Sequence, residues 1–439
     1  MSMIEISVGF VCLLGLLLVG FPVAVSIVTL GVIGGMVLFG PVLLKSMGPV
    51  LWGVSNANVL TAIPLFILLG ELLLRSGIAD RMYKALALWL ERLPGGLLHT
   101  NVGASALFAA TSGSSVATAA TVGTVALPAL SARGYSPRRA LGSLAAGGTL
   151  GILIPPSINL LIYGSLASVS VGQLFMAGVI PGILLTFLFM AFIASESLWR
   201  RARGQPDATE IAQKIPLSVK LRALVYLVPI AVVFTVVMGS IYLGIATPTE
   251  SAALAVIVAL GFVMREGKLT LAFLDGCFRQ TAKTTGMILL IIAAAFTLNV
   301  TLALGGIASI ISNWVNGLGL GPTGLLLALM LFYLILGMFM DVLSMQVLTI
   351  PIVVPIIMAA GINPIWFGIF VVLMSELGMI TPPVGMNLYV VQGVRTDSGP
   401  FSDVVRGAIP YAVLMLLFTF LLILVPGIAT WLPQTVMGR

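Results

Sequence analysis

The sequence predicts an all-α integral membrane protein built from two inverted repeats. Of its residues, 59% are hydrophobic and only 8% are charged, whereas an average soluble domain carries about a quarter charged residues. Apolar runs of about 18 residues or more recur along the chain, which is the length that crosses the hydrocarbon core of a bilayer as a helix. These runs are continuous rather than alternating, so they predict helices and not the strands of a barrel.

The internal repeat is visible in the spacing of glycine and proline. Each residue of the first copy precedes its counterpart by 227 positions, and the matched sets are Pro128, Gly134, Pro137, Gly151, Pro155, Pro156 and Pro355, Gly361, Pro364, Gly378, Pro382, Pro383. Loop 131–139 contains three arginines, and its counterpart 358–366 contains none. Because positively charged loops stay in the cytoplasm, this difference indicates that the two copies have opposite orientations.

The spans follow from the apolar runs. We expect them near residues 6–20, 22–40, 59–77, 140–166, 171–199, 223–243, 247–264, 284–304, 365–393 and 405–426. The predicted divisions are N-terminal scaffold spans (1–58), inverted repeat 1 (59–199), a cytoplasmic basic loop (200–222), connecting spans with a cytoplasmic amphipathic segment (223–283) and inverted repeat 2 (284–430). Each repeat is expected to contain a scaffold span, an arm helix at the surface, a hairpin, a broken span and a final span.

Charge sets the orientation. The loop 200–222 carries Arg200, Arg201, Arg203, Lys214, Lys220 and Arg222, so it is predicted to face the cytoplasm. The net charge of +7 resides largely in such short loops, which is typical of membrane topology and not of a nucleic-acid-binding surface. No basic segment precedes the first run, 6–20, so we interpret it as a retained span and not a signal peptide.

Two segments, 95–132 and 319–360, are each too long for one crossing. The first is interrupted at Ser112-Gly113-Ser114-Ser115 and the second at Gly337-Met338-Phe339-Met340-Asp341. We predict two re-entrant helical hairpins, the first open to the cytoplasm and the second to the outside, buried in protein or lining a cavity. Pro-Pro pairs interrupt the spans that follow. Paired breaks in inverted repeats are typical of secondary transporters, whose binding site lies where the breaks meet.

The breaks also suggest the chemistry of the site. Proline leaves the carbonyl four residues earlier without its helical donor, and such carbonyls with Ser and Thr hydroxyls form a neutral oxygen cage suited to Na⁺. We predict about two Na⁺ sites, formed by Ser112, Ser115, Gly151, Ile154 and Pro156 in the first repeat and by Gly337, Gly378, Thr381 and Val384 in the second. The Gly, Ile, Pro and Val residues would contribute backbone carbonyls. The alternative is that each hydroxyl bonds only its own helix backbone.

Helix N-termini at the breaks attract carboxylates through unpaired N–H groups and the positive end of the helix dipole. No Lys or Arg lies between Lys283 and Arg395, so anion binding in the second repeat must rely on such dipoles and on bound cations. The predicted substrate-binding residues are Ser114, Ser115, Pro155, Ser157, Asn159, Pro382 and Asn387.

Four acids lie within or beside apolar spans, namely Glu71, Glu250, Asp341 and Glu376. Ionisable groups at such depth are functional candidates. We expect Glu250 to be a structural helix cap in Ala246-Thr247-Pro248-Thr249-Glu250 and Asp341 to have a gating or ion-linked role. Proton coupling through Asp341 and Glu376 is an alternative to Na⁺ coupling. No catalytic residues are predicted, because no nucleophile or acid–base constellation is present, and we expect no enzyme.

The motifs together resemble one family, the large membrane (M) subunit of tripartite ATP-independent periplasmic (TRAP) transporters. The resemblance rests on Ala62–Leu68, Ser112–Ser115, Ile154–Ser157, Ala246–Glu250, Gly337–Asp341 and Thr381–Gly385 in this order. It implies an elevator-type architecture of the ion-transporter superfamily and Na⁺-coupled import of a small carboxylate across the bacterial inner membrane. The family's Na⁺ positions fall on the hairpin and Pro-Pro residues named above.

The resemblance also implies two protein partners, a small membrane subunit of about four spans and a periplasmic substrate-binding protein. The chain is expected to be the form in which the two membrane subunits are not fused. The alternative is a stand-alone Na⁺- or H⁺-coupled dicarboxylate transporter of the related ion-transporter architecture, which would need no binding protein.

Overall fold

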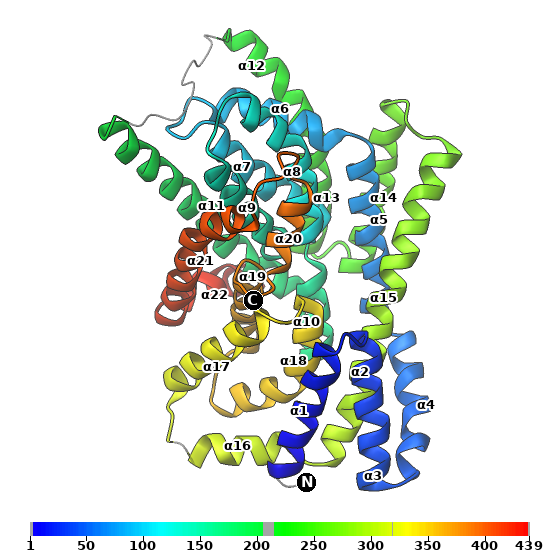
Figure 1. The fold of residues 1–439 in the computed structure, drawn as a ribbon. Coiled ribbons are helices and arrows are strands. Elements are labelled where there is room, and N and C mark those ends of the chain that lie inside the picture. The colour runs from blue at the N-terminus through cyan, green and yellow to red at the C-terminus, as the bar shows by residue number, and fades with distance from the viewer. Residues whose placement is uncertain (1–2, 205–214, 318, 438–439) are drawn as a thin grey trace.

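The computed structural model describes residues 3–204, 215–317 and 319–437, and every regular element in these ranges is a helix (Figure 1). By length and apolar composition, eight of these helices can cross a membrane, and a ninth span is formed by two helices that meet at an angle of 43°. The predicted helical membrane protein is therefore confirmed. Part of the predicted basic loop, 205–214, lies outside the described residues.

The N-terminal region contains one more helix than the sequence predicted. Helix α1 (Met3–Leu18) precedes α2 (Val23–Thr29), which continues through a π-helical turn, Leu30–Gly34, into α3 (Gly35–Phe39). Helix α4 (Val42–Ser55) follows, in a stretch where no span was expected. The apolar pattern there is interrupted by Lys45 and Pro49, yet a helix is present and packs against a long helix of the second repeat.

The two repeats contain the same series of elements in the predicted order. Repeat 1 comprises α5 (Ala62–Arg75), α6 (Ile78–Leu90), α7 (Leu97–Ser112), α8 (Ser115–Ala132), α9 (Pro137–Leu153), α10 (Ile158–Ala167) and α11 (Val171–Ala202). Repeat 2 comprises α15 (Leu271–Leu304), α16 (Ile307–Gly317), α17 (Pro322–Gly337), α18 (Val342–Ala359), α19 (Pro364–Met379), α20 (Met386–Gly393) and α21 (Phe401–Leu424). Between them lie α12 (Leu217–Ala223), α13 (Val228–Tyr242) and α14 (Pro248–Arg265), and α22 (Gly427–Met437) ends the described chain.

One predicted boundary differs from the structure. The sequence separated an amphipathic segment ending at residue 283 from a span beginning at 284, whereas α15 runs without a break from Leu271 to Leu304. The Thr270 hydroxyl caps this helix by accepting a hydrogen bond from the Phe273 N–H at 3.1 Å. No proline follows within the helix, so nothing interrupts its hydrogen bonds between the polar and the apolar part.

The repeats interlock. The second half of each broken span packs against the hairpin of the other repeat, so that α10 contacts α18 and α20 contacts α8. Each final span also packs against the broken span of the other repeat, so that α11 contacts α19 and α21 contacts α9. The Tyr163 hydroxyl of α10 donates to the carbonyl oxygen of Pro364 at 2.5 Å. The contacts between helices occur in equivalent pairs, one from each repeat, so the two repeats are arranged symmetrically, as the sequence predicted.

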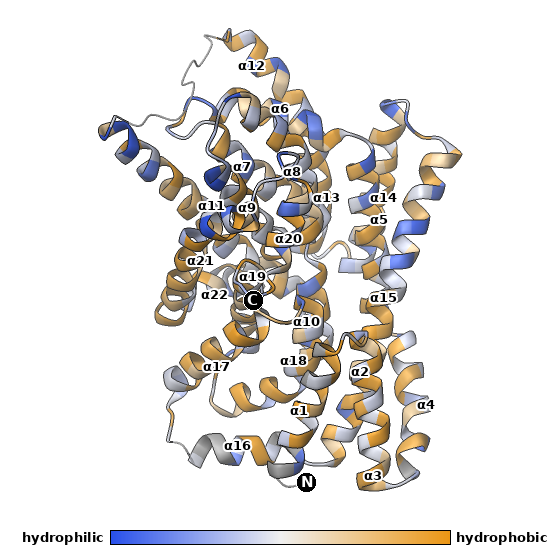
Figure 2. Cartoon of the chain, in the orientation of Figure 1, coloured by the Kyte–Doolittle hydropathy of each residue, from blue (hydrophilic) through white to orange (hydrophobic). Residues whose placement is uncertain are grey.

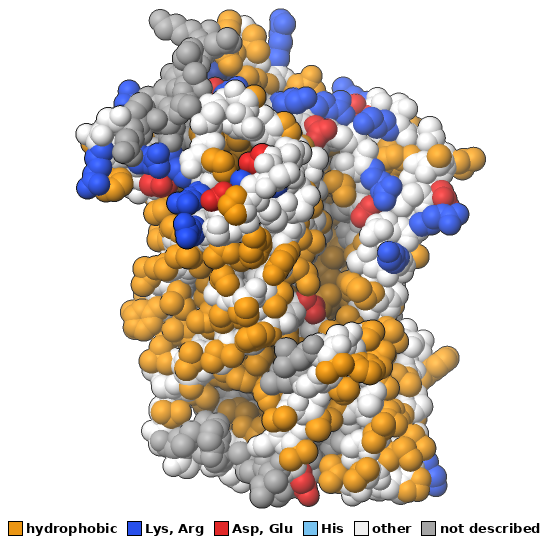
Figure 3. All heavy atoms as spheres, viewed as in Figure 1, with side chains coloured by type: hydrophobic (Ala, Val, Ile, Leu, Met, Phe, Trp, Pro, Cys, Tyr) orange, Lys and Arg blue, Asp and Glu red, His pale blue; other side chains and the backbone are white. Residues whose placement is uncertain are grey.

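Charge and hydropathy mark the membrane orientation. Lys and Arg side chains gather at one end of the visible face, around α6, α12 and the end of α11, and a broad hydrophobic band lies below them (Figures 1 and 3). Colouring by hydropathy gives the same division (Figure 2). In Figure 1 the hairpin α7–α8 lies toward the charged end, and α17–α18 lies toward the other. The hairpins therefore occupy opposite sides, as expected for inverted repeats.

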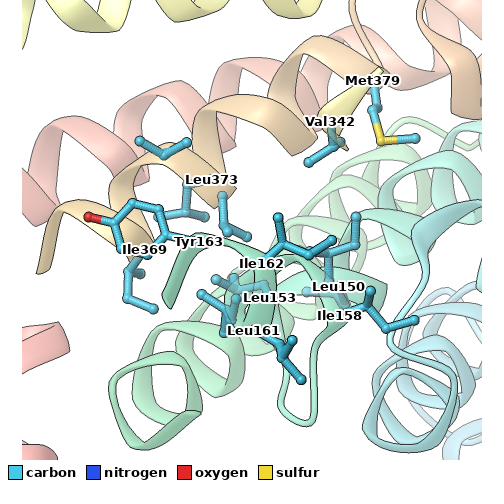
Figure 4. Packing of buried hydrophobic residues seen from close by; sticks show 14 of the residues in the cluster. Leu150, Leu153, Ile158, Leu161, Ile162, Tyr163, Val342, Ile369, Leu373 and Met379 are labelled. Carbon is cyan, nitrogen blue, oxygen red and sulfur yellow. The ribbon is translucent and has the colours of Figure 1, made fainter. Parts of the chain in front are cut away.

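The most deeply buried core lies where the broken spans meet. One hydrophobic cluster contains Leu150, Leu153, Leu161 and Tyr163 of repeat 1 with Ile369 and Leu373 of repeat 2, and Tyr163 lies beside the last two (Figure 4). Helix α19 is buried almost throughout, from Trp366 to Met379. A span that is apolar all around and covered on every side belongs to the interior of a bundle, which places the breaks of both repeats at the centre of the protein.

The crossing of α9 and α21 depends on two glycines, and this gives a test of the packing. A Cβ on Gly142 would lie 2.1 Å from the carbonyl oxygen of Gly407, closer than any real contact. We expect Gly142→Ala to destabilise the protein by about 1–3 kcal/mol, the usual penalty for overpacking. The control Gly261→Ala places its methyl group in open space and is expected to be neutral or slightly stabilising through helix propensity. Thermal unfolding in detergent measures both, and equal melting temperatures would contradict the close crossing.

Candidate functional site

The break of hairpin 1 packs directly on the Pro-Pro break of the first repeat. Helix α7 ends at Ser112, and Gly113 takes a left-handed conformation (φ 58°) before α8 begins. A Cβ on Gly113 would lie 3.1 Å from the carbonyl oxygen of Pro156 and 3.3 Å from the backbone nitrogen of Ile158. Only glycine combines this backbone conformation with so close an approach. The predicted residues of the first Na⁺ site therefore lie in two segments that touch.

Gly151 brings the same two segments together one turn earlier. A Cβ on Gly151 would lie 2.7 Å from the carbonyl oxygen of Ser114 and 2.8 Å from the Cα of Ser115. The break continues through Ile154, the extended residue that follows the end of α9, and a cis peptide bond between Pro155 and Pro156. Ser157 then caps α10 by accepting a hydrogen bond from the Leu160 N–H at 3.3 Å.

The second repeat reproduces this contact with different atoms. A Cβ on Gly378 would lie 2.5 Å from the Cα of Gly337, the residue at which α17 ends. The Val384 N–H donates a hydrogen bond of 3.2 Å to the carbonyl oxygen of Met338. The Pro382–Pro383 bond is cis, as in the first repeat. Hairpin 2 and broken span 2 thus meet at the residues that the repeat pattern singled out.

The hydroxyls at the two breaks bond nearby oxygens but keep lone pairs available. Thr118 donates to the carbonyl oxygen of Ser114 at 2.8 Å and lies 2.9 Å from the Ser112 hydroxyl, so Ser112 is the donor in that second bond. Thr381 donates to the carbonyl oxygen of Leu377 at 2.6 Å. Because a hydroxyl has one hydrogen and two lone pairs, Ser112 and Thr381 can still accept or coordinate through oxygen. Thr118 was not singled out by the sequence.

The four acids have distinct environments. Asp341 caps α18 by accepting hydrogen bonds from the N–H groups of Leu343 and Ser344 at 3.1 and 3.2 Å. Glu250 forms a capping box with Thr247 at the start of α14, and it is exposed. Glu71 pairs with Arg75 one turn later at 2.9 Å. Glu376 alone is fully buried, in the middle of α19.

Glu376 reaches across to the other repeat. Its carboxylate accepts a hydrogen bond from the Ser115 hydroxyl at the start of α8, 261 positions away in sequence. Its other oxygen has no hydrogen-bond partner in the described structure, and neither does either amide atom of Asn387. Asn159 Oδ1 and both amide atoms of Gln346 are also buried without partners. The sequence did not single out Gln346, although an amide within an apolar hairpin is a detectable signal.

Four helices begin at these breaks, two from each repeat. Within the described residues, side chains cap α8 (Ser114), α10 (Ser157) and α18 (Asp341). Helix α20 follows Gly385 and has no side-chain cap. Its first N–H groups, together with the buried amide of Asn387, provide donors toward which an anion is attracted.

A separate pocket of about 600 Å³ opens beside the arm helix of repeat 1. Its lining includes Tyr83, Lys84 and Glu91 from the region of α6 and Val125, Ala129 and Arg133 from the region of α8. None of the predicted ion or substrate residues lines it. It lies between the hairpin and the arm helix, toward the charged end of the molecule.

The breaks of the two repeats bring buried polar side chains together, as the hydrogen bond from Ser115 to Glu376 shows. The family model described as the tripartite ATP-independent periplasmic transporter, DctM component, matches residues 10–428. The chain belongs to this TRAP transporter family. It is thus a multi-pass component of a secondary transporter of the bacterial inner membrane, and the resemblance predicted from the motifs is confirmed.

Relatives of this DctM-family chain extend over almost its full length. It is 36% identical to a C4-dicarboxylate TRAP transporter large permease of Pseudomonas aeruginosa, covering 92% of this chain and 94% of the relative. It is 33% identical to another from Vibrio cholerae, covering 99% and 98%. Both relatives are named as large permease proteins. The fold of the YdaH transporter of Alcanivorax borkumensis is similar, with a TM-score of 0.64, 17% identity and 89% of each chain covered.

Proposed function

We propose that this TRAP large permease imports a small organic carboxylate together with Na⁺. The observation that carries the proposal is the contact between hairpin and Pro-Pro break in both repeats, where backbone carbonyls and hydroxyls converge. A set of oxygen ligands with no Lys or Arg side chain among them suits Na⁺. The relatives named for C4-dicarboxylates support a carboxylate substrate. In this proposal the predicted site residues act in two roles, with the carbonyl and hydroxyl oxygens holding Na⁺ and the N-termini of α10 and α20 with Asn159 and Asn387 receiving the anion.

The mechanism we propose is of the elevator type. Helix α14 packs on α5 and on α13, and α5 packs on α15. In this mechanism these four helices would form the scaffold. The hairpins and broken spans form a second body that touches the scaffold through α5 and α7, α13 and α7, and α15 and α18. Movement of this body would carry the ions and substrate from one side to the other.

The proposal includes two partners. A small membrane subunit of about four spans would enlarge the scaffold, and a periplasmic protein would deliver the substrate to the outer face. Exposed apolar side chains such as Trp52 and Leu254 on α4 and α14 face lipid or such a subunit. A chain that transported without partners would instead be the stand-alone carrier considered above.

The experiment is uptake of a labelled C4-dicarboxylate into liposomes that contain this chain, its small membrane subunit and its binding protein. We expect uptake to require the binding protein and an inward Na⁺ gradient. Ser112→Ala and Thr381→Ala should each reduce it by at least about tenfold, because each removes an oxygen ligand of a cation. The matched control Ser195→Ala removes an exposed hydroxyl bonded to its own helix at Phe192 and should leave uptake unchanged. Uptake that follows pH and ignores Na⁺ would refute Na⁺ coupling.

A further inference from the structure

We propose that Glu376 supplies a carboxylate ligand to the cation site of the first repeat. That site would then be built from both repeats and would carry a negative charge of its own, whereas the sequence predicted a neutral cage of hydroxyl and carbonyl oxygens. The proposal rests on the proposed function, because it assigns a further ligand to a coupling ion.

The first observation is the position of the carboxylate. Glu376 is 0% exposed, and it contacts Ser115, a predicted ligand of the first site, through a hydrogen bond from the Ser115 hydroxyl. None of the described Lys or Arg side chains forms an ion pair with it. A buried carboxylate that stays ionised requires a compensating charge or a full set of hydrogen bonds, and Glu376 Oε2 has neither in the described structure.

The second observation is a convergent amide. Asn387 is 0% exposed, and both of its amide atoms lack partners in the described structure. Its Nδ2 atom and the carbonyl oxygen of Ser115 lie 3.2 and 3.4 Å from the same point, the position of a Cβ on Gly148. Asn387 therefore comes from the second repeat to the same turn of α8 that Glu376 contacts. The absence of side chains at Gly148 and Gly151 makes room for this approach.

The donor set favours a monovalent cation. Its oxygens come from one carboxylate, one amide, one hydroxyl and nearby carbonyls, and no group of three or more His, Cys, Asp or Glu side chains is found among the described residues. Hard cations prefer oxygen ligands, and divalent ions are usually held by more than one carboxylate. One bound Na⁺ would balance the charge of Glu376 and would give Oε2 and Asn387 Oδ1 the partner that each lacks.

This arrangement also links the ion to the substrate. In the structure Nδ2 is the amide atom beside the carbonyl oxygen of Ser115, so a half-turn of the Asn387 amide is needed to bring Oδ1 to the cation. Nδ2 then becomes a donor for the anion proposed to bind at the uncapped start of α20. Ion binding would orient the amide for the carboxylate, and it would hold hairpin 1 against broken span 2.

The test measures ion binding without transport. The purified full chain is titrated with NaCl, with choline chloride at equal ionic strength as reference, and its melting temperature is recorded. We expect Na⁺ to raise the melting temperature of the wild type, and Glu376→Gln to raise the half-maximal Na⁺ concentration by about tenfold or more. Glu376→Asp, which retains the charge, should keep more of the response than Glu376→Gln. The control Asp275→Asn removes an exposed carboxylate paired with Arg279 and should titrate like the wild type.

The outcomes separate this proposal from the proposed function. A wild-type Na⁺ response that Glu376→Gln leaves unchanged overturns the carboxylate ligand, while Na⁺ coupling stands. If NaCl and choline chloride shift the melting temperature of the wild type equally, then both the proposed Na⁺ coupling and the Glu376 ligand are overturned. Should Glu376→Gln not yield folded protein, Glu376→Asp serves in its place, because its shorter side chain withdraws the carboxylate from the site. A half-maximal Na⁺ concentration equal to that of the wild type in Glu376→Asp would then overturn the carboxylate ligand.

Discussion

Uptake by Gly378→Ala is expected to fall to background. The added methyl group would lie 2.5 Å from the Cα and carbonyl carbon of Gly337 and 2.6 Å from its oxygen. These are backbone atoms and cannot rotate away, so hairpin 2 must separate from broken span 2. The carbonyl oxygens proposed to hold the second Na⁺ would then no longer converge. A ligand displacement of about 1 Å is enough to reduce activity by about a hundredfold, and overpacking adds about 1–3 kcal/mol of instability.

The comparison for this variant is Gly393→Ala at the end of α20, whose methyl group would meet no atom within 4 Å. Uptake into proteoliposomes and thermal unfolding are measured on both variants. Gly393→Ala should transport like the wild type. Wild-type uptake and melting temperature in Gly378→Ala would show that the two breaks do not depend on their glycine contact.

Gly70→Leu is expected to slow uptake by at least about tenfold while Na⁺ binding is retained. Gly70 lies on α5 of the proposed scaffold, and a Cβ there would lie 3.5 Å from the Cα of Ser112 in hairpin 1. One methyl group makes an ordinary contact at this distance, but the branched end of leucine would project into the break of the hairpin. If the hairpin must slide past α5, the closely packed interior has no room for the added side chain along that path. The leucine should therefore hinder movement more than it hinders ion binding.

Gly70→Ala is the matched variant, because its methyl group fits at that distance, and it should transport at close to the wild-type rate. Initial uptake rates and the Na⁺-dependent melting temperature are measured for both variants. An unchanged rate in Gly70→Leu would argue against sliding at this surface. A parallel loss of rate and Na⁺ response would instead mean that the leucine distorts the ion site itself.

The sequence by itself determined the class, the orientation and the positions of the breaks. Low charge, apolar runs and arginine-rich loops determine whether each segment lies in water or in lipid, and this depends only on the local sequence. The breaks at Ser112–Ser115 and Gly337–Asp341 were predictable for the same reason. Glycine and proline act on their own turn of helix, and the constant spacing of the repeat identified which interruptions mattered.

Only the tertiary structure decided which segments meet. Several contacts join residues that are far apart in sequence. They are the packing of α11 and α21 on the other repeat, the packing of α4 on α15 and the hydrogen bond from Ser115 to Glu376. No local pattern specifies such contacts, because they depend on how helices of similar composition are placed around one another. The sequence therefore identified Glu376 as a buried acid but assigned it only to an alternative proton route. Its place beside the proposed first ion site follows from the packing of one inverted repeat against the other.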